Sequence, residues 1–178
     1  MVGCEAEEVP SQINAQGEVY NSAMDYDNVF KWWKKSAEQG HAKAQIWLAH
    51  LYDMGEGVEH DHNEAIRLWE KSAEQGNSAA QYNLGLIYDY GIFVDEDKIK
   101  AFEFYEKSAE QGNSTAQYNL GLIYDYGIFV NEDKIKAFEF YEKSAEQGES
   151  FAQYNLGHFY RLGLGGAVKD KSEASKWY

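Results

Sequence analysis

Apolar residues recur along this chain with the period of amphipathic helices, and the helices come in pairs. In residues 78–90, Ala80, Leu84 and Tyr88 are spaced four residues apart, which places one apolar stripe along a helix. Residues 97–111 show the same spacing, so a second helix follows after a short glycine-containing loop. The stripe of this second helix consists of Ala101, Tyr105 and Ala109.

The helix pair belongs to a block of 36 residues that recurs along the chain. Residues 77–112 and 113–148 differ at two positions only, Ala79 against Thr115 and Asp95 against Asn131. A fixed period in this range predicts an all-α solenoid in which each unit buries its apolar face against its neighbours. The predicted segments are an acidic tail or irregular cap (1–24), an orphan helix (25–40), three full repeats (41–76, 77–112 and 113–148) and a truncated fourth (149–178).

Both ends of the predicted helices have capping signals. Ser78 with Gln81 matches a capping box at the start of a first helix, and the pattern recurs in the next two blocks. An aspartate stands at the N-cap of each second helix and a glycine at its C-cap. The aspartates are Asp25, Asp61, Asp97, Asp133 and Asp170, and the glycines are Gly40, Gly76, Gly112 and Gly148.

Composition narrows the class of partner. The formal net charge of −14 disfavours binding to nucleic acid or to anionic membranes, so we expect a basic or polar protein partner. No apolar run has the length of a membrane span. The chain ends on the hydrophobic pair Trp177 and Tyr178, from which we hypothesise that the natural protein continues or that a partner covers this end.

The N-terminal segment leaves the compartment open. The first thirty residues contain no Lys or Arg, so they do not match a signal peptide or a transit peptide. Cys4 follows small residues, as at a lipoprotein cleavage site, which suggests a lipid anchor in the native protein and a bacterial envelope or periplasm. The alternative is a chance cysteine in a loose tail. A single cysteine forms no internal disulfide.

The repeat resembles the Sel-1-like repeat family, a relative of the tetratricopeptide repeat. The residues that show this are A-Q-Y-N-L-G-x-x-Y in the first helix and A-x-x-x-Y-x-K-S-A-E-Q-G in the second, at a spacing of 36 residues over about residues 25–178. The resemblance implies a right-handed superhelix of antiparallel helix pairs whose concave face binds proteins or peptides.

The resemblance also implies which residues line that face. By similarity to tetratricopeptide units, the first helix of each pair contributes four rows of side chains. These are Tyr82, Tyr118 and Tyr154; Asn83, Asn119 and Asn155; Leu86, Leu122 and His158; and Asp53, Asp89, Asp125 and Arg161. Asparagine both donates and accepts hydrogen bonds, and tyrosine offers rigid contact area with a polar tip. Alternatively, the rows recur only because the unit was duplicated and the tyrosines are half core.

The repeats depart from the family pattern at two positions. Gly57 matches the family loop, whereas Phe93 and Phe129 stand where that second glycine is usual. Ala49 replaces the helix glycine. The sequence leaves open whether the two phenylalanines pack into the stack or form a contact surface.

Candidate catalytic and metal-binding residues are few. His60, His62 and Glu64 are metal-ligand types, but a polar loop with an N-cap explains them better than a zinc site does. His158 has no nucleophile specified near it. No phosphate-binding loop or nucleophile motif is present, so we predict no cofactor and no catalysis.

These observations predict a non-enzymatic scaffold that binds a basic or polar protein segment. A second hypothesis is a bacterial immunity or inhibitor protein that neutralises a secreted toxin. A third follows from the resemblance alone, because cysteine-rich members of the family have been linked to β-lactam binding or hydrolysis. This chain lacks their paired cysteines.

Overall fold

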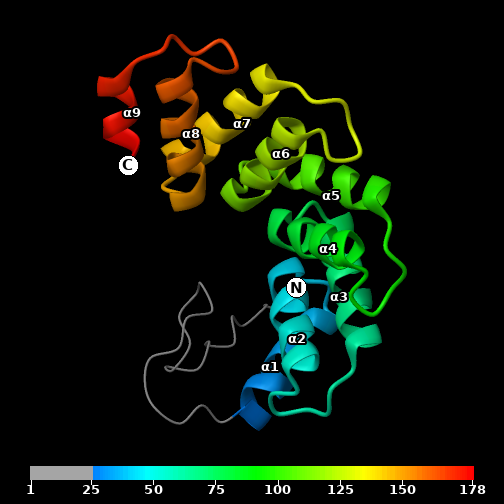
Figure 1. Cartoon of the computed structure of the whole chain (residues 1–178). Coiled ribbons are helices and arrows are strands. Elements are labelled where there is room, and N and C mark those ends of the chain that lie inside the picture. The colour runs from blue at the N-terminus through cyan, green and yellow to red at the C-terminus, as the bar shows by residue number, and fades with distance from the viewer. Residues whose placement is uncertain (1–25) are drawn as a thin grey trace, which may run out of the picture. The chain divides into compact units, whose positions relative to one another are not determined.

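The computed structural model describes residues 26–178, and the regular secondary structure of this range consists of helices joined by loops (Figure 1). Repeated helix pairs follow one another along the chain, which confirms the predicted all-α solenoid class. The predicted tail and the cap at Asp25 lie outside the described residues. The helices are α1 (Tyr26–Glu38), α2 (Ala42–Met54), α3 (His62–Glu74), α4 (Ser78–Tyr90), α5 (Lys98–Glu110), α6 (Ser114–Tyr126), α7 (Lys134–Glu146), α8 (Ser150–Leu162) and α9 (Lys171–Trp177).

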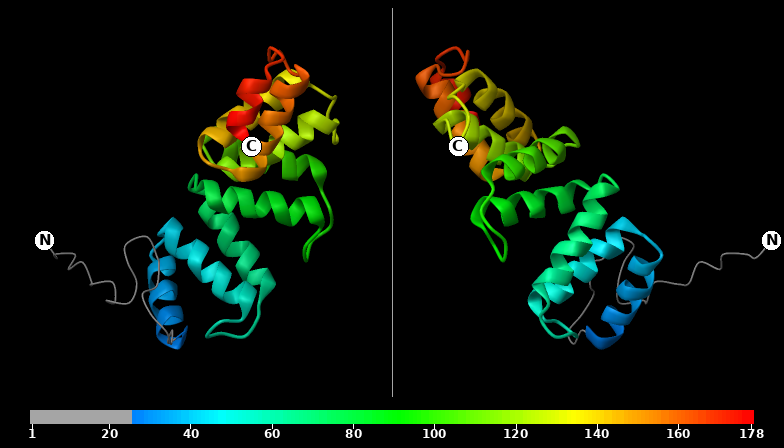
Figure 2. Two further views of the ribbon diagram at one scale, coloured as in Figure 1. Left: turned by 60° about the vertical axis from the view of Figure 1, so that its left-hand side comes forward. Right: turned by 90° about the vertical axis from the view of Figure 1, so that its right-hand side faces the viewer.

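The described chain forms two compact units, residues 26–68 and 69–178, and the division falls within α3. In unit 1, α1 packs against α2. In unit 2, each helix from α4 to α9 packs against the next helix along the chain. Figure 2 shows the last of these pairs, α8 and α9, side by side in both views.

The first helices of unit 2 begin differently from the prediction. Asn77 and Asn113 are the N-caps of α4 and α6, and their side chains accept hydrogen bonds from backbone amides of the first turn. The serine that follows each cap is already the first helical residue. The predicted serine–glutamine capping box is therefore wrong, because an asparagine one residue earlier satisfies the amides in its place. Glu149 holds the same position before α8 but makes no such bond.

The glutamines of the supposed capping box connect successive helix pairs instead. The Gln81 side-chain amide donates to the carbonyl of Ala73 at 3.3 Å, and Gln117 donates to Ala109 at 3.1 Å. Both glutamine side chains are buried. A buried amide needs a partner, so these bonds fix where each first helix lies on the preceding second helix.

The ends of the second helices agree with the sequence. Asp61, Asp97, Asp133 and Asp170 each accept a hydrogen bond from a backbone amide of the first turn. The predicted C-terminal glycines have φ between 83° and 91°, which is the left-handed conformation that favours glycine. No helix within residues 26–178 is both long and apolar enough to cross a membrane.

Buried tyrosines form the centre of unit 2. Tyr105 and Tyr141 are 0% exposed, and each ring lies on a glycine of the first helix of its own repeat. A Cβ at Gly85 or Gly121 would lie 2.6 Å from the ring, which is shorter than van der Waals contact. Glycine is therefore required in α4 and α6 because it lets the tyrosine ring approach the helix backbone.

Candidate functional site

Three tyrosines of the predicted binding face occupy the same position in successive first helices of unit 2. Tyr82 and Tyr118 are half-buried, whereas Tyr154 is 62% exposed. Each contacts the tyrosine of the second helix of its own repeat. The ring centroids are 6.1 Å apart for Tyr82 and Tyr105, 6.1 Å for Tyr118 and Tyr141, and 5.6 Å for Tyr154 and Tyr178.

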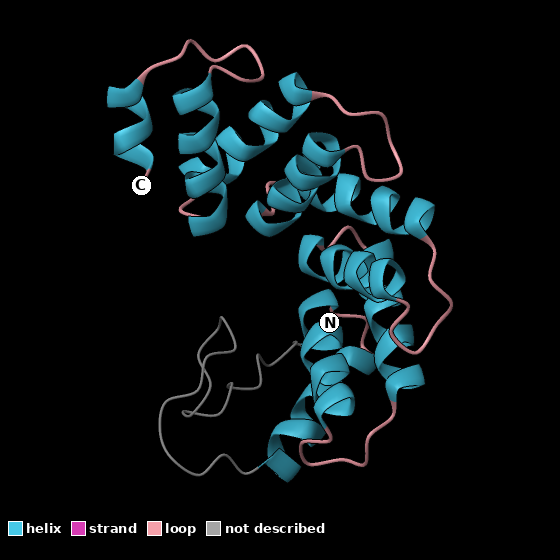
Figure 3. Ribbon diagram, in the orientation of Figure 1, coloured by secondary structure: helices cyan, strands magenta, loops and turns pink. Residues whose placement is uncertain are grey.

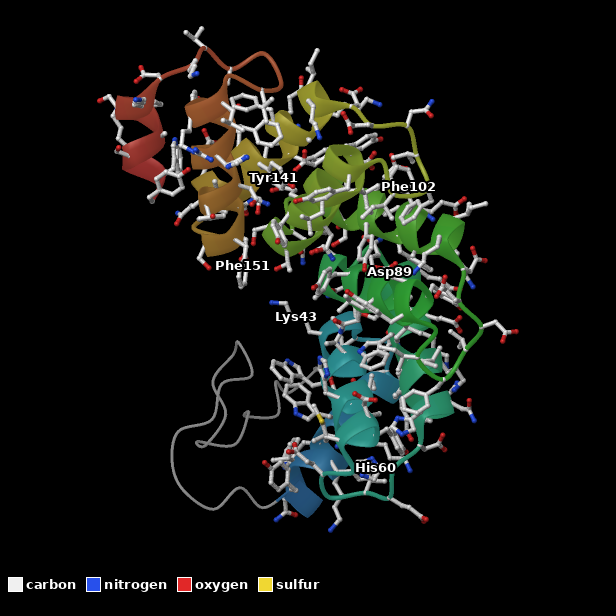
Figure 4. The ribbon with its side chains drawn as sticks, viewed as in Figure 1. Lys43, His60, Asp89, Phe102, Tyr141 and Phe151 are labelled. Carbon is white, nitrogen blue, oxygen red and sulfur yellow. The ribbon has the colours of Figure 1, made fainter. Side chains whose placement is uncertain are left out.

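An exposed phenylalanine extends this row between α6 and α8. The Phe151 ring stacks on Tyr118 with centroids 6.0 Å apart, and Phe151 is 66% exposed. Figure 4 shows Phe151 at the start of α8. The equivalent residues of the two preceding repeats are Ala79 and Thr115, so only the fourth repeat has an aromatic residue here. We use the term tyrosine surface for Tyr82, Tyr118, Phe151 and Tyr154.

The asparagine row lies among the tyrosine hydroxyls. Asn83, Asn119 and Asn155 are all half-buried. In the pKa shifts of the neighbouring tyrosines, Asn119 opposes the rise for Tyr82 and Tyr105, and Asn155 opposes it for Tyr141. Asparagine side chains can both donate and accept hydrogen bonds, so this row adds polar groups beside the tyrosine surface.

The aspartate row differs from the prediction. Asp125 is 9% exposed, accepts a hydrogen bond from the Tyr141 hydroxyl at 3.1 Å, and pairs with Lys134 at 2.8 Å. Asp89 repeats this arrangement with Tyr105 at 3.1 Å and Lys98 at 3.0 Å, and Figure 4 shows Asp89 at the end of α4. Asp125 is therefore buried rather than exposed, and Asp89 is only partly exposed, because the loop returns a lysine to each carboxylate.

Electrostatics favour the protonated form of the tyrosines and lysines in this network. Burial, followed by the charge of Asp125, raises the pKa of Tyr141, so its hydroxyl remains a donor at neutral pH. Burial opposes the charged form of Lys134, but the hydrogen bond and charge of Asp125, together with Glu132, outweigh it and raise the pKa of the lysine. The same shifts recur at Tyr105 and Lys98. Asp89 and Asp125 thus position the buried tyrosines on which the tyrosine surface lies.

The fourth repeat departs from this network. Arg161 occupies the aspartate position and is exposed. Its Nη2 atom lies 3.0 Å from Nδ1 of His158, which replaces the leucine of the preceding repeats. Tyr178 takes the place of the buried tyrosine and lies on Gly157. The predicted face of unit 2 therefore changes from paired carboxylates to a cationic group at α8.

The histidine cluster of unit 1 is a set of loop contacts. His60 Nδ1 lies 2.9 Å from the Asp53 carbonyl, and His62 Nδ1 lies 3.1 Å from the Asp53 carboxylate. Glu64 pairs with Arg67. In the part of the chain that the structure describes, no group of three or more His, Cys, Asp or Glu side chains is arranged to hold a metal ion.

One exposed aromatic residue of unit 1 was not identified from the sequence. Trp47, in α2 of unit 1, stands 36 residues before Asn83 and is 38% exposed. Its ring stacks on Trp33 with centroids 6.3 Å apart and lies 5.9 Å from His50. Burial lowers the pKa of His50, and the charge of Asp53 opposes this shift. Extending the asparagine row one repeat towards the N-terminus would have identified Trp47.

Comparison with solved structures gives similar proteins from bacteria. A Sel1 repeat protein from Oxalobacter formigenes is 36% identical with a TM-score of 0.81, over 86% of this chain and 62% of its own. The protective antigen c5321 of uropathogenic Escherichia coli, which has an SLR fold, is 34% identical with a TM-score of 0.66, over 86% of this chain and 40% of its own. Immunity protein PA5088 from Pseudomonas aeruginosa is 25% identical with a TM-score of 0.62, over 89% of this chain and 57% of its own.

The chain thus spans less than two thirds of the length of each of these three proteins. Comparison with curated protein sequences gives no match. The family model of the Sel1 repeat matches residues 30–41, 42–77, 78–113, 114–149 and 150–178, which together cover most of the chain. The chain therefore belongs to the Sel1 repeat family.

Proposed function

We propose that this protein is a non-enzymatic scaffold that binds a basic or polar segment of another protein on the tyrosine surface of unit 2. Sel1 repeat proteins are generally protein-interaction scaffolds, which supports the class of function. The observation that supports the site is the row of aromatic side chains from α4 to α8, ending in Phe151 and Tyr154, which are 66% and 62% exposed.

Exposed aromatic residues in a row favour a binding surface over a structural role. Tyrosine and phenylalanine contribute large contact areas at small conformational cost, and they are enriched where proteins bind one another. The stacking of Phe151 on Tyr118 leaves most of the phenylalanine ring accessible. A ligand lying across α6 and α8 would cover both rings.

The charge around this surface favours a basic or polar ligand. Burial is the main cause of the raised pKa of Tyr82 and Tyr118, and the negative charge of Glu149 adds to the rise at both. The whole chain has a net charge of −14, which attracts cationic segments. His158 and Arg161 lie at the other end of α8, where they suit a polar or anionic group of the same ligand.

Selection from a displayed peptide library, followed by affinity measurements, tests this proposal. Tyr118→Ala and Tyr154→Ala should each lower the affinity for the selected ligand by about tenfold or more, as expected for central aromatic contacts. Val168→Ala is the control, because Val168 is 81% exposed and lies in the loop between α8 and α9. Unchanged affinity in both tyrosine variants would refute the tyrosine surface.

The non-enzymatic part of the proposal has its own assay. The third hypothesis, β-lactam hydrolysis, rests on paired cysteines, and residues 26–178 contain no cysteine. We expect no turnover of a chromogenic β-lactam by the purified protein. Turnover that persists after repurification would contradict the scaffold proposal.

A second candidate function is that of an immunity protein. The likeness to immunity protein PA5088, at 25% identity and a TM-score of 0.62, is the observation that favours it. On this hypothesis the ligand is a secreted toxin. The test is to co-express the chain with a toxin-like protein encoded beside it: restored growth that Tyr154→Ala abolishes supports the hypothesis, and growth inhibition that the chain does not relieve contradicts it.

A further inference from the structure

Two phenylalanines of unit 2 adopt a backbone conformation that normally requires glycine. Phe93 and Phe129 have φ values of 59° and 49°, and they are the non-glycine residues with positive φ in the described part of the chain. The equivalent loop residues of the other two repeats are Gly57 and Gly165, with φ of 70° and 60°. A bulky side chain in this conformation is strained, and such strain is concentrated at functional sites.

The glycine loops show what the phenylalanines replace. A Cβ at Gly165 would lie 2.2 Å from the Lys134 carbonyl oxygen and 2.7 Å from Cβ of Phe138, so glycine lets the loop backbone lie directly on α7. Phe129 cannot make that approach. Its ring instead meets Phe102 edge to face, with centroids 6.0 Å apart, and Figure 4 shows Phe102 beside the α6–α7 loop.

The contact with Phe102 covers only part of the phenylalanine. Phe129 remains 39% exposed and Phe93 58% exposed. Packing against the stack is therefore incomplete, although glycine at the same position would adopt this backbone conformation without strain. The strain together with the exposure favours a role for these side chains outside the core.

Exposed isoleucines accompany each phenylalanine in the loop and in the helix turn that follows it. Figure 3 shows the α4–α5 and α6–α7 loops at the same edge of unit 2. We use the term loop edge for six apolar residues of these loops and of the first turn that follows each. They are, with their exposed fractions, Ile92 (40%), Phe93 (58%), Ile99 (73%), Ile128 (42%), Phe129 (39%) and Ile135 (60%).

Acidic side chains accompany this apolar edge. Glu96 and Glu132 are 58% and 60% exposed and lie between the phenylalanine and the isoleucine of their own repeats. The lysines beside them, Lys98 and Lys134, pair with Asp89 and Asp125 and also lie 3.4 and 3.5 Å from the Glu96 and Glu132 carboxylates. Each glutamate has a second carboxylate oxygen, and its exposed side chain can accept a further donor. Lys100 and Lys136 lie over the rings of Tyr88 and Tyr124.

We propose that the loop edge is a second interaction surface, which binds an amphipathic basic segment of a partner protein. Apolar side chains of the segment contact Phe93, Phe129 and the isoleucines, and its lysines or arginines pair with Glu96 and Glu132. The two nearly identical loops present the same contacts twice, so a regular helix or strand meets both. The net charge of −14 disfavours a second copy of this acidic chain as the occupant.

The double variant Phe93→Gly/Phe129→Gly separates binding from folding. Glycine relieves the backbone strain and leaves every charge in place, so we expect a melting temperature within about 4 °C of wild type. The probe is an 18-residue helical peptide of leucine and lysine with one apolar face. Its binding is measured by fluorescence anisotropy. The variant should bind it at least about fivefold more weakly than wild type.

Two controls complete the experiment. Val168→Ala, at a residue that is 81% exposed and belongs to neither surface, should bind this probe as wild type does, and a peptide with glutamate in place of lysine should not bind. Ile99→Ser/Ile135→Ser removes exposed side chains and should weaken binding in the same way as the glycine variant. Failure of these variants to weaken binding overturns the loop-edge proposal and leaves the tyrosine surface untouched.

Other occupants would give different results. If wild type dimerises in sedimentation and the glycine variant is monomeric, the edge binds a second copy and the proposal is wrong. If wild type binds zwitterionic lipid vesicles and the glycine variant does not, the occupant is a membrane, which also overturns it. A fall in melting temperature well beyond 4 °C at unchanged probe affinity would show that the phenylalanines are structural.

Discussion

The Tyr141 hydroxyl donates a hydrogen bond to Asp125 at 3.1 Å, and the same carboxylate holds Lys134 at 2.8 Å. This relationship recurs one repeat earlier between Tyr105 and Asp89. It joins the end of a first helix to the middle and the start of the following second helix. The aspartates predicted to contact a ligand therefore stabilise the helix pair whose outer face is the tyrosine surface.

Removal of Asp125 should destabilise unit 2. Asp125→Ala leaves the buried Tyr141 hydroxyl without its acceptor and Lys134 without its counter-ion. We expect the free energy of unfolding, measured in urea, to fall by about 2 kcal/mol. The loss is not larger because Lys134 is 32% exposed and reaches solvent. Asp125→Asn retains an acceptor and should lose less. A loss below about 0.5 kcal/mol would mean that the network is incidental.

Alanine in place of Gly121 should also destabilise the protein. The new Cβ would lie 2.6 Å from the Tyr141 ring, so the ring or α6 must move. Overpacking of this kind lowers the free energy of unfolding by about 1–3 kcal/mol. A glycine-to-alanine substitution at an open helix position usually has the opposite effect, because alanine favours the helix. Gly85→Ala is the internal control, because its surroundings in the preceding repeat are nearly the same. A rise in melting temperature for either variant would contradict the close packing of helix and ring.

The helix caps allow a matched comparison. Asn113→Ala removes a side chain that accepts the Ala116 amide hydrogen bond at 2.9 Å and should cost about 1 kcal/mol. Glu149 holds the same position before α8 but makes no side-chain cap bond. Glu149→Ala should therefore lower the free energy of chemical unfolding much less than Asn113→Ala does. Equal losses for the two variants would argue against the capping role of Asn113.

The buried tyrosines predict how stability depends on alkaline pH. Burial raises the pKa of Tyr141, so its contribution is present below the unfolded tyrosine pKa of about 10 and is lost as the pH rises towards the folded value. Above pH 10, each such tyrosine should reduce stability by about 1.4 kcal/mol per pH unit. Tyr141→Phe should show a shallower decline than wild type in unfolding measured at pH 10 to 11. Parallel declines would contradict a buried, protonated Tyr141.

The predictable part of the fold followed from repetition. Identical spacing of Ala101, Tyr105 and the C-terminal glycines determined the helix pairs, because each signal occurs at the same place in every repeat. The capping box was wrong because the sequence offers two competing caps, and Asn77 lies one residue ahead of Ser78. Local pattern alone did not decide between them.

The site was less predictable because its contacts cross loops. Asp89 and Lys98 are nine residues apart, and only the folded loop shows that they pair. The positive φ of Phe129 could not be predicted either, because phenylalanine disfavours this conformation. The alignment of Phe129 with Gly57 showed only that the position was unusual. The exposure of Phe151 depends on the neighbouring Tyr118, which periodicity within one helix does not report.

Photo-crosslinking with the peptide selected from the library tests the central proposal most directly. A benzophenone amino acid is introduced in place of Tyr154, which is 62% exposed on α8, and in a second protein in place of Ile135, which is 60% exposed on α7. Binding on the tyrosine surface predicts a crosslink to the ligand from position 154 and none from position 135. Crosslinking from position 135 alone would contradict the proposed site.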